Sequence, residues 1–273
     1  MDLDQDGNLD ILSGSYSRME GEMAGLFQVL WGRKEGTFAR AKPLLSEDAK
    51  PLVLPGDEGD RICTRPFAGD LDGDGHLDLV VGSMGPSFSF FAGKGKGRFD
   101  PRARRLEGSN LWVDSHSDPF LVDWDGDGDL DLLSGSAAGG VFLFPNEGSK
   151  TSARFGRRVT LVKQPRDLVP QGQPDVLGDA HLRGPGMATR VWADDTNGDG
   201  KLDLFVGDCV TLYHAAEGVS AATALEKLAA WKKAVAEIPD GDGWSEQYSR
   251  LTAERDAFVT DESVGFVWLV RRK

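Results

Sequence analysis

The sequence predicts an all-β protein, a β-propeller of about four four-stranded antiparallel blades in an incomplete or strained arrangement, with an αα-hairpin inserted in the last blade. Three observations lead to this prediction. An acidic nine-residue stretch recurs, with copies that begin at residues 2, 70, 123 and 195. Each copy is followed by a short apolar run that is typical of a buried strand. The distance between copies leaves room for about four short strands per unit, as in propeller blades.

The copies share the pattern D-x-[DN]-x-D-G-x-L-D. Empty, their side-chain oxygens would repel one another, and Ca²⁺, which takes six to eight oxygens at about 2.3–2.6 Å, relieves that repulsion. The Gly at position 6 permits the sharp turn, and position 7 offers its backbone carbonyl, so its side chain is free to vary. The sequence therefore predicts up to four Ca²⁺ sites. Their side-chain ligands are Asp2, Asp4, Asp6 and Asp10; Asp70, Asp72, Asp74 and Asp78; Asp123, Asp125, Asp127 and Asp131; and Asp195, Asn197, Asp199 and Asp203, with the carbonyls of Asn8, His76, Asp129 and Lys201.

An EF-hand loop opens in the same way but requires a Glu at position 12 and helices on both sides. Position 12 is Ser13, Val81, Ser134 and Val206. The Asp at position 9 can supply the closing carboxylate instead. The following runs are short and end in Gly, which indicates strands, so we expect the loops to lie in β-hairpins.

The third copy shows the expected blade plan best. Its four strands are predicted at 119–124, 130–136, 141–144 and 154–161, and those of the second unit at 62–69, 77–83, 88–92 and 98–106. In the first unit, strands two to four are expected at 9–15, 26–31 and 37–44, and only Met1 stands where an inner strand should precede the loop. Turns at 32–36, 93–97 and 146–152 are each followed by an aromatic residue, namely Phe38, Phe99 and Phe155.

These units form one predicted domain over residues 1–273. Its blades are expected at about 1–45, 61–107, 117–162 and 187–271, and the polar, Pro- and Gly-rich segments 45–60 and 162–186 join them. The fourth unit predicts strands at 187–194, 202–208 and 209–214, then a helical insertion at 220–258, then an outer strand at 264–270. Ser220 and Ser245 are plausible N-caps of two helices. The aromatic residues of the insertion pack against the propeller or form a docking surface for a partner; the sequence leaves both open.

The bulk composition excludes several classes of protein. The 273 residues carry a net charge of −13, which disfavours nucleic acid as a partner. No apolar stretch approaches the roughly 20 residues that span a bilayer. Two cysteines, Cys63 and Cys209, are too few for a disulfide framework and are either buried thiols or one bridge.

No catalytic constellation can be recognised. Residues 114–118 contain Asp, Ser and His, but neighbours in an extended chain point to opposite faces and cannot form a local triad. The Gly- and Lys-rich turn at 93–97 lacks the spacing of a phosphate-binding loop, and 240–243 resembles only a fragment of the metal loop.

The loop, the apolar strand after it and the Gly-x-Phe turn resemble those of the FG-GAP/VCBS repeat family, which are Ca²⁺-binding β-propellers also seen in integrin α-subunits. The resemblance covers essentially all of the chain except the insertion. It implies a loop between the first two strands of each blade, Ca²⁺ at positions 1, 3, 5, 7 and 9, and an exported location. Complete family propellers usually have about seven blades, and only four units are present here. Because only Met1 precedes the first loop, whereas the other loops follow strand-like runs, the chain is expected to begin inside its first repeat. The expected function is an exported binding or adhesion module with a protein or polysaccharide ligand and no enzymatic activity; the alternative is the propeller part of an exported polysaccharide-active enzyme or lectin.

Overall fold

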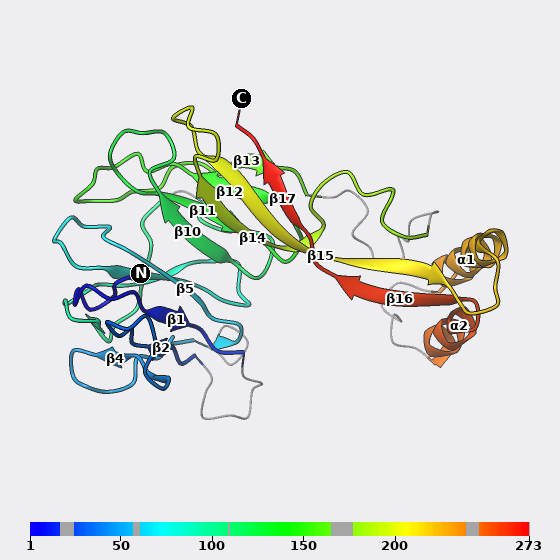
Figure 1. Ribbon diagram of the computed structural model, residues 1–273, viewed down its shortest axis with the longest axis horizontal. Helices are drawn as coiled ribbons and strands as arrows, with labels where there is room; N and C mark the ends of the chain where they lie inside the picture. The colour runs from blue at the N-terminus through cyan, green and yellow to red at the C-terminus, as the bar shows by residue number, and fades with distance from the viewer. Residues whose placement is uncertain (17–24, 57–60, 109, 165–176, 239–245, 273) are drawn as a thin grey trace.

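Four small antiparallel sheets in a β-propeller arrangement make up most of the molecule, with a helix pair near the C-terminus (Figure 1). The computed structural model describes residues 1–16, 25–56, 61–108, 110–164, 177–238 and 246–272. The sheets follow one another from the N-terminal one at the lower left of Figure 1 to the fourth at the upper centre. Their first strands are neighbours, since β5 contacts β1 and β10, and β10 contacts β14.

The second and third sheets have four strands each, as predicted. The second comprises β5 (Arg65–Gly69), β6 (Asp78–Gly82), β7 (Ser89–Phe91) and β9 (Arg104–Arg105). The third comprises β10 (Asp118–Val122), β11 (Asp131–Gly135), β12 (Val141–Phe144) and β13 (Val159–Val162). The first sheet has only three, β1 (Ile11–Ser13), β2 (Gln28–Leu30) and β3 (Lys42–Pro43), as expected from the missing inner strand.

The predicted outer strand 98–106 is wrong in one respect, because it is two strands. Its first part, β8 (Arg98–Phe99), leaves the second sheet and pairs in parallel with β4 (Leu45–Ser46). Segment 45–60, expected to be only a polar linker, supplies β4 and two buried leucines, Leu52 and Leu54, to the core between the first two sheets.

The core consists of layers between consecutive sheets. Val81 of β6 faces the first sheet, whereas its neighbour Val80 faces the third. Leu132 and Leu133 of β11 divide in the same way between the second and fourth sheets. Because both faces of the second strand are covered, these strands are continuous apolar runs rather than alternating ones.

A Gly at the end of each second strand sets the spacing between blades. A Cβ on Gly14, Gly82 or Gly135 would overlap with a backbone carbonyl of the next unit, that of Thr64, Ser117 or Thr189 respectively. The hydroxyl of the same Thr or Ser accepts a hydrogen bond from the residue after the Gly, as when Ser136 N donates to Thr189 Oγ1 at 2.9 Å. At Gly207 of the fourth unit the nearest atom to such a Cβ is Arg190 Cβ at 3.7 Å.

The fourth unit departs from the prediction. β14 (Met187–Asp194) pairs with β15, which runs without a break from Asp203 to Ala215. The predicted separate strand at 209–214 is therefore wrong, since no turn residue follows Asp208. The first half of β15 pairs with β17 (Val267–Val270) inside the blade, and its second half pairs with β16 (Val259–Val264) outside it. Residues 264–270 are predicted to be the outer strand, but β17, which lies within them, is the third strand of this blade.

The second half of β15 and β16 form an arm that carries the helix pair at its far end (Figure 1). The helices are α1 (Ala221–Ala236) and α2 (Glu246–Asp256), and Ser220 caps the first, its side chain accepting from Thr223 N at 3.2 Å. Their apolar residues, with Trp231 and Leu228 at the centre, pack on Tyr213 and Val259 of the arm and form a separate core. The expectation that they pack on the propeller is thus wrong. Ser245 and the 240–243 motif lie outside the described residues.

Candidate metal centres

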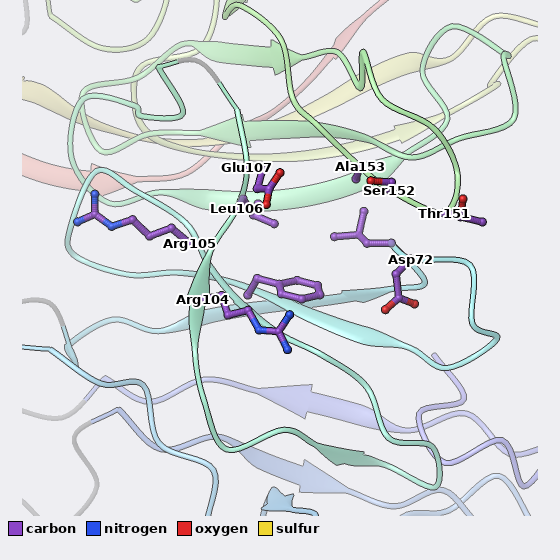
Figure 2. Close-up of a pocket in the computed structure, with 10 residues that line it drawn as sticks. Asp72, Arg104, Arg105, Leu106, Glu107, Thr151, Ser152 and Ala153 are labelled. Atoms are coloured by element: carbon purple, nitrogen blue, oxygen red, sulfur yellow. The ribbon is translucent and has the colours of Figure 1, made fainter.

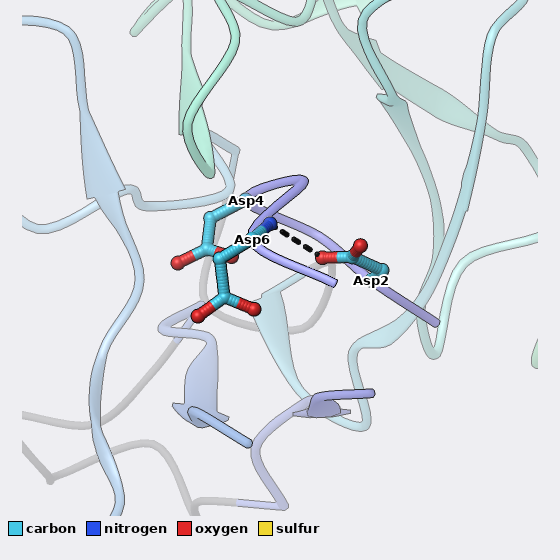
Figure 3. A group of neighbouring side chains, drawn as sticks. All are labelled: Asp2, Asp4 and Asp6. Atoms are coloured by element: carbon cyan, nitrogen blue, oxygen red, sulfur yellow. Dashed lines mark hydrogen bonds between the residues drawn. The ribbon is translucent and has the colours of Figure 1, made fainter. Parts of the chain in front are cut away.

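Three of the four acidic loops bring carboxylates together. Within each group the ligand atoms lie within 4.8 Å of one another; the groups are Asp2, Asp4 and Asp6; Asp70, Asp72 and Asp78; and Asp123, Asp125 and Asp127. Figure 3 shows the first group, in which the side chains of Asp4 and Asp6 lie together across the turn from Asp2. Among the described residues, no ion pair reaches any of these carboxylates. The arrangement offers three oxygen ligands to a cation in each of three loops.

Backbone hydrogen bonds hold the carboxylates in place. In the third loop, Asp123 accepts from Gly126 N at 2.8 Å and from Gly128 N at 3.0 Å, while Asp127 accepts from Asp129 N at 3.1 Å. Asp2, Asp70 and Asp195 accept from their own loops in the same manner. The fourth loop has the same geometry with Asn197 at position 3, so it carries one negative charge fewer than the others.

Positions 4 and 6 of each loop adopt left-handed backbone angles. These angles let N–H groups of the loop point at the carboxylate of position 1. The residues are Gly at both places in the last three loops, for example Gly126 (φ 82°) and Gly128 (φ 95°). In the first loop position 4 is Gln5 (φ 62°), whose side chain donates to Gly75 O of the second loop at 2.8 Å. The sequence pattern explained only the Gly at position 6.

The Asp at position 9 has a structural role that the sequence did not reveal. It is buried in all four loops, and its two oxygens accept from opposite directions. One oxygen accepts from the N–H of position 2, as Asp78 does from Leu71 at 2.9 Å, and the other from the start of the turn after the third strand, here Gly93 at 2.7 Å. In the fourth loop the partners are Thr196 Oγ1 and Arg272 N. A second lone pair on each oxygen is left for a cation. In the second loop this carboxylate, Asp78, is itself one of the three that lie within 4.8 Å of one another.

The electrostatics differ between the loops. Burial raises the pKa of Asp78 to about 6 despite its two backbone hydrogen bonds, and the neighbouring Asp72 and Asp74 add to the effect. Burial, then Asp6 and Asp10, raise the pKa of Asp4. In the fourth loop the hydrogen bond from Gly200 N lowers the pKa of Asp195, and that from Thr196 lowers the pKa of Asp203. Burial and neighbouring carboxylates thus favour the neutral form in the first two loops, and hydrogen bonds favour the charged form in the fourth.

Position 7 differs between loops more than expected. Lys201 is exposed, but Asp129 is 8% exposed, and one of its carboxylate oxygens has no hydrogen-bond partner among the described residues. Burial and the nearby Asp127 raise the pKa of Asp129. His76 is half-buried, and its ring lies against Gly95.

A small cleft opens beside the second loop, between the second and third blades (Figure 2). It encloses about 240 Å³, and its lining includes Asp72, Arg104, Arg105, Glu107 and Thr151. Figure 2 shows Asp72 of the metal loop across the cleft from Arg104 and Arg105. Arg104 pairs with Asp100 at 3.5 Å. The cleft thus lies beside the second loop, and one of the arginines that line it already has a carboxylate partner.

Ser115 and His116 are in contact, Oγ to Nδ1 at 2.8 Å. The expectation that neighbouring side chains cannot meet here is wrong, because both residues have left-handed angles (φ 66° and 48°) rather than extended ones. The carboxylates nearby are engaged elsewhere: Asp114 pairs with Arg158 at 3.6 Å and Asp118 with two arginines. Both cysteines are free; Cys63 is buried and Cys209 is exposed.

Fold and loops together define a repeat β-propeller in which an acidic loop precedes the second strand of each blade. A family model for FG-GAP-like repeats matches residues 2–81 and 70–134, which contain the first three loops. Residues 2–134 are therefore FG-GAP-like repeats, and the resemblance drawn from the sequence is confirmed. No curated protein matches the chain.

Proposed function

We propose that this protein is a Ca²⁺-stabilised β-propeller that serves as an exported binding or adhesion module. The observation that carries the proposal is the convergence of three carboxylates within 4.8 Å in each of three loops, without a paired cation among the described residues. Ligands that are all oxygens, with the carbonyl of position 7 expected among them, suit Ca²⁺ better than Mg²⁺, which requires a tight octahedron.

The cation has a structural role in this proposal. The loops of the last three blades join the first two strands, and position 9 connects each loop to the rest of its blade. Neutralising the loop charge removes repulsion that the folded chain otherwise bears. Extracellular Ca²⁺ sites have dissociation constants of roughly 10⁻⁴–10⁻³ M, which suits an exported protein, and FG-GAP-like repeats are typically extracellular. None of the described helices is long and apolar enough to cross a membrane.

Binding is favoured over catalysis by the surroundings of Ser115 and His116. The carboxylates that could orient the imidazole are engaged with Arg158, Arg65 and Arg190. FG-GAP-like propellers are in general non-catalytic. We therefore assign the chain a ligand-binding role with a protein partner.

Metal analysis tests the proposal directly. The protein is stripped with chelator, passed into chelator-free buffer and titrated calorimetrically with CaCl₂, with MgCl₂ as the comparison. We expect at least three Ca²⁺ per chain, with Mg²⁺ binding more weakly. Binding of no Ca²⁺ at 5–10 mM, about ten times a typical extracellular dissociation constant, contradicts the proposal.

A further inference from the structure

The inner strands carry a second cluster of charges, at the end opposite to the metal loops. Arg65 and Asp118 are the first residues of β5 and β10, and Arg190 lies in the middle of β14. They occupy one structural position, because each pairs with the equivalent Gly of the second strand: Gly82, Gly135 and Gly207. The loops begin at the other end of the same strands, so the two sites are separate.

The cluster has an excess of positive charge. Arg65 Nε and Arg190 Nε lie 3.7 Å and 3.5 Å from the same atom, Asp118 Oδ1. Arg65 also donates to His116 O at 2.9 Å, and its side chain is 18% exposed. Arg190 is 44% exposed and faces solvent. One carboxylate thus serves two guanidinium groups, in a chain whose net charge is −13.

The neighbouring titratable groups do not remove the excess. Burial and then the two arginines lower the pKa of His116, so it is neutral near pH 7. Burial raises the pKa of the Cys63 thiol, although both arginines oppose this, so the thiol also stays neutral. A second carboxylate at this position would complete the charge balance.

Aromatic side chains form a layer next to the charges. Two residues further along the same strands are Phe67, Phe120 and Trp192, with ring centroids 4.8 Å apart for the first pair and 5.0 Å for the second. Because residues two apart on a strand share a face, Trp192 lies beside Arg190. Trp192 is 56% exposed. Trp and Arg are enriched in the hot spots of protein interfaces, and here both are exposed and lie side by side.

The backbone fixes this end of the strands. Cys63, His116 and Ala188 stand two residues before the three cluster residues and all have left-handed angles (φ 56°, 48° and 50°). Each of these left-handed backbone conformations costs on the order of 1 kcal/mol. It is retained because the residue that follows is hydrogen-bonded to the preceding blade. The cluster is therefore preorganised, which lowers the entropic cost of binding.

We propose that this end of the inner strands binds an acidic segment of a protein partner, with one Asp or Glu carboxylate on the exposed guanidinium of Arg190, beside its pair with Asp118, and an apolar neighbour packed on Trp192. The complementarity of charge and the pairing of Arg with Trp select this occupant. The inference deepens the proposed binding role and does not depend on Ca²⁺.

The probes are two blocked tetrapeptides, Leu-Asp-Leu-Asp and Leu-Asn-Leu-Asn, titrated while the indole N–H resonance of Trp192 is followed by NMR, with Trp192→Phe identifying that signal. We expect the Asp peptide to shift the signal at millimolar concentration and the Asn peptide to leave it in place. Equal shifts with both peptides, or none, overturn the proposal without any variant having to fold.

Arg190→Gln should weaken binding of the Asp peptide about tenfold, as expected for loss of a charge-assisted hydrogen bond. Arg250→Gln is the matched control, because Arg250 is an exposed arginine on α2 that pairs only with Glu254 among the described residues. Equal affinity in Arg190→Gln and the wild type contradicts the assignment. An oligogalacturonate that binds more tightly than the peptide, with the same dependence on Arg190, overturns the choice of a protein partner. Loss of calcium-dependent melting would overturn the metal proposal and leave these titrations unaffected.

Discussion

Asp131 connects two backbone segments of the third blade: its Oδ1 accepts from Asn146 N at 2.7 Å, and its Oδ2 accepts from Trp124 N at 3.0 Å. The side chain is 2% exposed. The loop and the turn after the third strand are thereby held together whether or not a cation is present. Position 9 is thus a structural residue, in addition to any role as a ligand.

Asp131→Asn should destabilise the fold even in excess chelator. The amide keeps one acceptor and places an NH₂ group against a backbone donor, which costs about 1.5–3 kcal/mol. Asp127→Asn is the control, since Asp127 is exposed and should change only the calcium-dependent part of the stability. Urea unfolding with and without Ca²⁺ separates the two effects. If both variants match the wild type in chelator, position 9 has no structural role.

The contact between blades depends on a Gly at a position where a side chain would clash with the next blade. Gly135→Ala would overlap with the carbonyl of Thr189, so a loss of about 3 kcal/mol is expected. The equivalent change in the fourth unit, Gly207→Ala, meets only Arg190 Cβ at 3.7 Å and should cost less than about 1 kcal/mol. Chemical denaturation measures both. Equal losses would show that the Gly serves strand conformation and not blade packing.

The arm should unfold separately from the propeller. Trp231 is 5% exposed and packs within the core formed by the helices and the end of β15 and β16. Trp231→Ala should remove about 3–5 kcal/mol of packing and increase hydrogen exchange in α1 and α2, leaving β5–β12 protected. Hydrogen exchange with mass spectrometry resolves the two regions. Uniform loss of protection would mean that the arm and the propeller unfold together.

Acid stability should depend on Asp100. Its hydrogen bonds to Arg102 lower the pKa of Asp100 to about 2. Since the folded state has the lower pKa, this stabilisation is complete above the ordinary value of about 3.8 and is lost as the pH falls towards 2. Arg102 is 81% exposed, so solvent screening keeps the effect small. Asp100→Asn should reduce the slope of stability between pH 4 and pH 2; an unchanged slope contradicts this assignment.

The sequence was sufficient for the features with a local cause. The acidic loops, the buried runs such as β11 and β12, and the N-cap Ser220 all follow from spacing and residue type within a few positions. The turns at 93–97 and 146–152, each followed by an aromatic residue, also follow from the repeat; the structure adds that Gly93 pairs with Phe99 and Asn146 with Phe155.

The features that the sequence missed depend on partners far along the chain. The prediction divides this segment into two strands at Asp208, yet β15 continues without a break and pairs with β16. β8 pairs with β4, more than fifty residues earlier. Arg65, Asp118 and Arg190 carry no local signal, since only the arrangement of the blades brings them together. A repeat pattern predicts the strands and loops that recur in every unit, but it does not predict the segments in which one unit differs from the others.

Calcium-dependent thermal unfolding tests the central claim most directly. The protein is melted in excess EDTA, in 5 mM CaCl₂ and in 5 mM MgCl₂ at equal ionic strength, with circular dichroism at a wavelength sensitive to strands. Saturation of several sites at tenfold excess over their dissociation constants contributes about 1.4 kcal/mol each, so Ca²⁺ should raise the melting temperature by several degrees and Mg²⁺ by clearly less. Three superimposable melting curves would contradict the account.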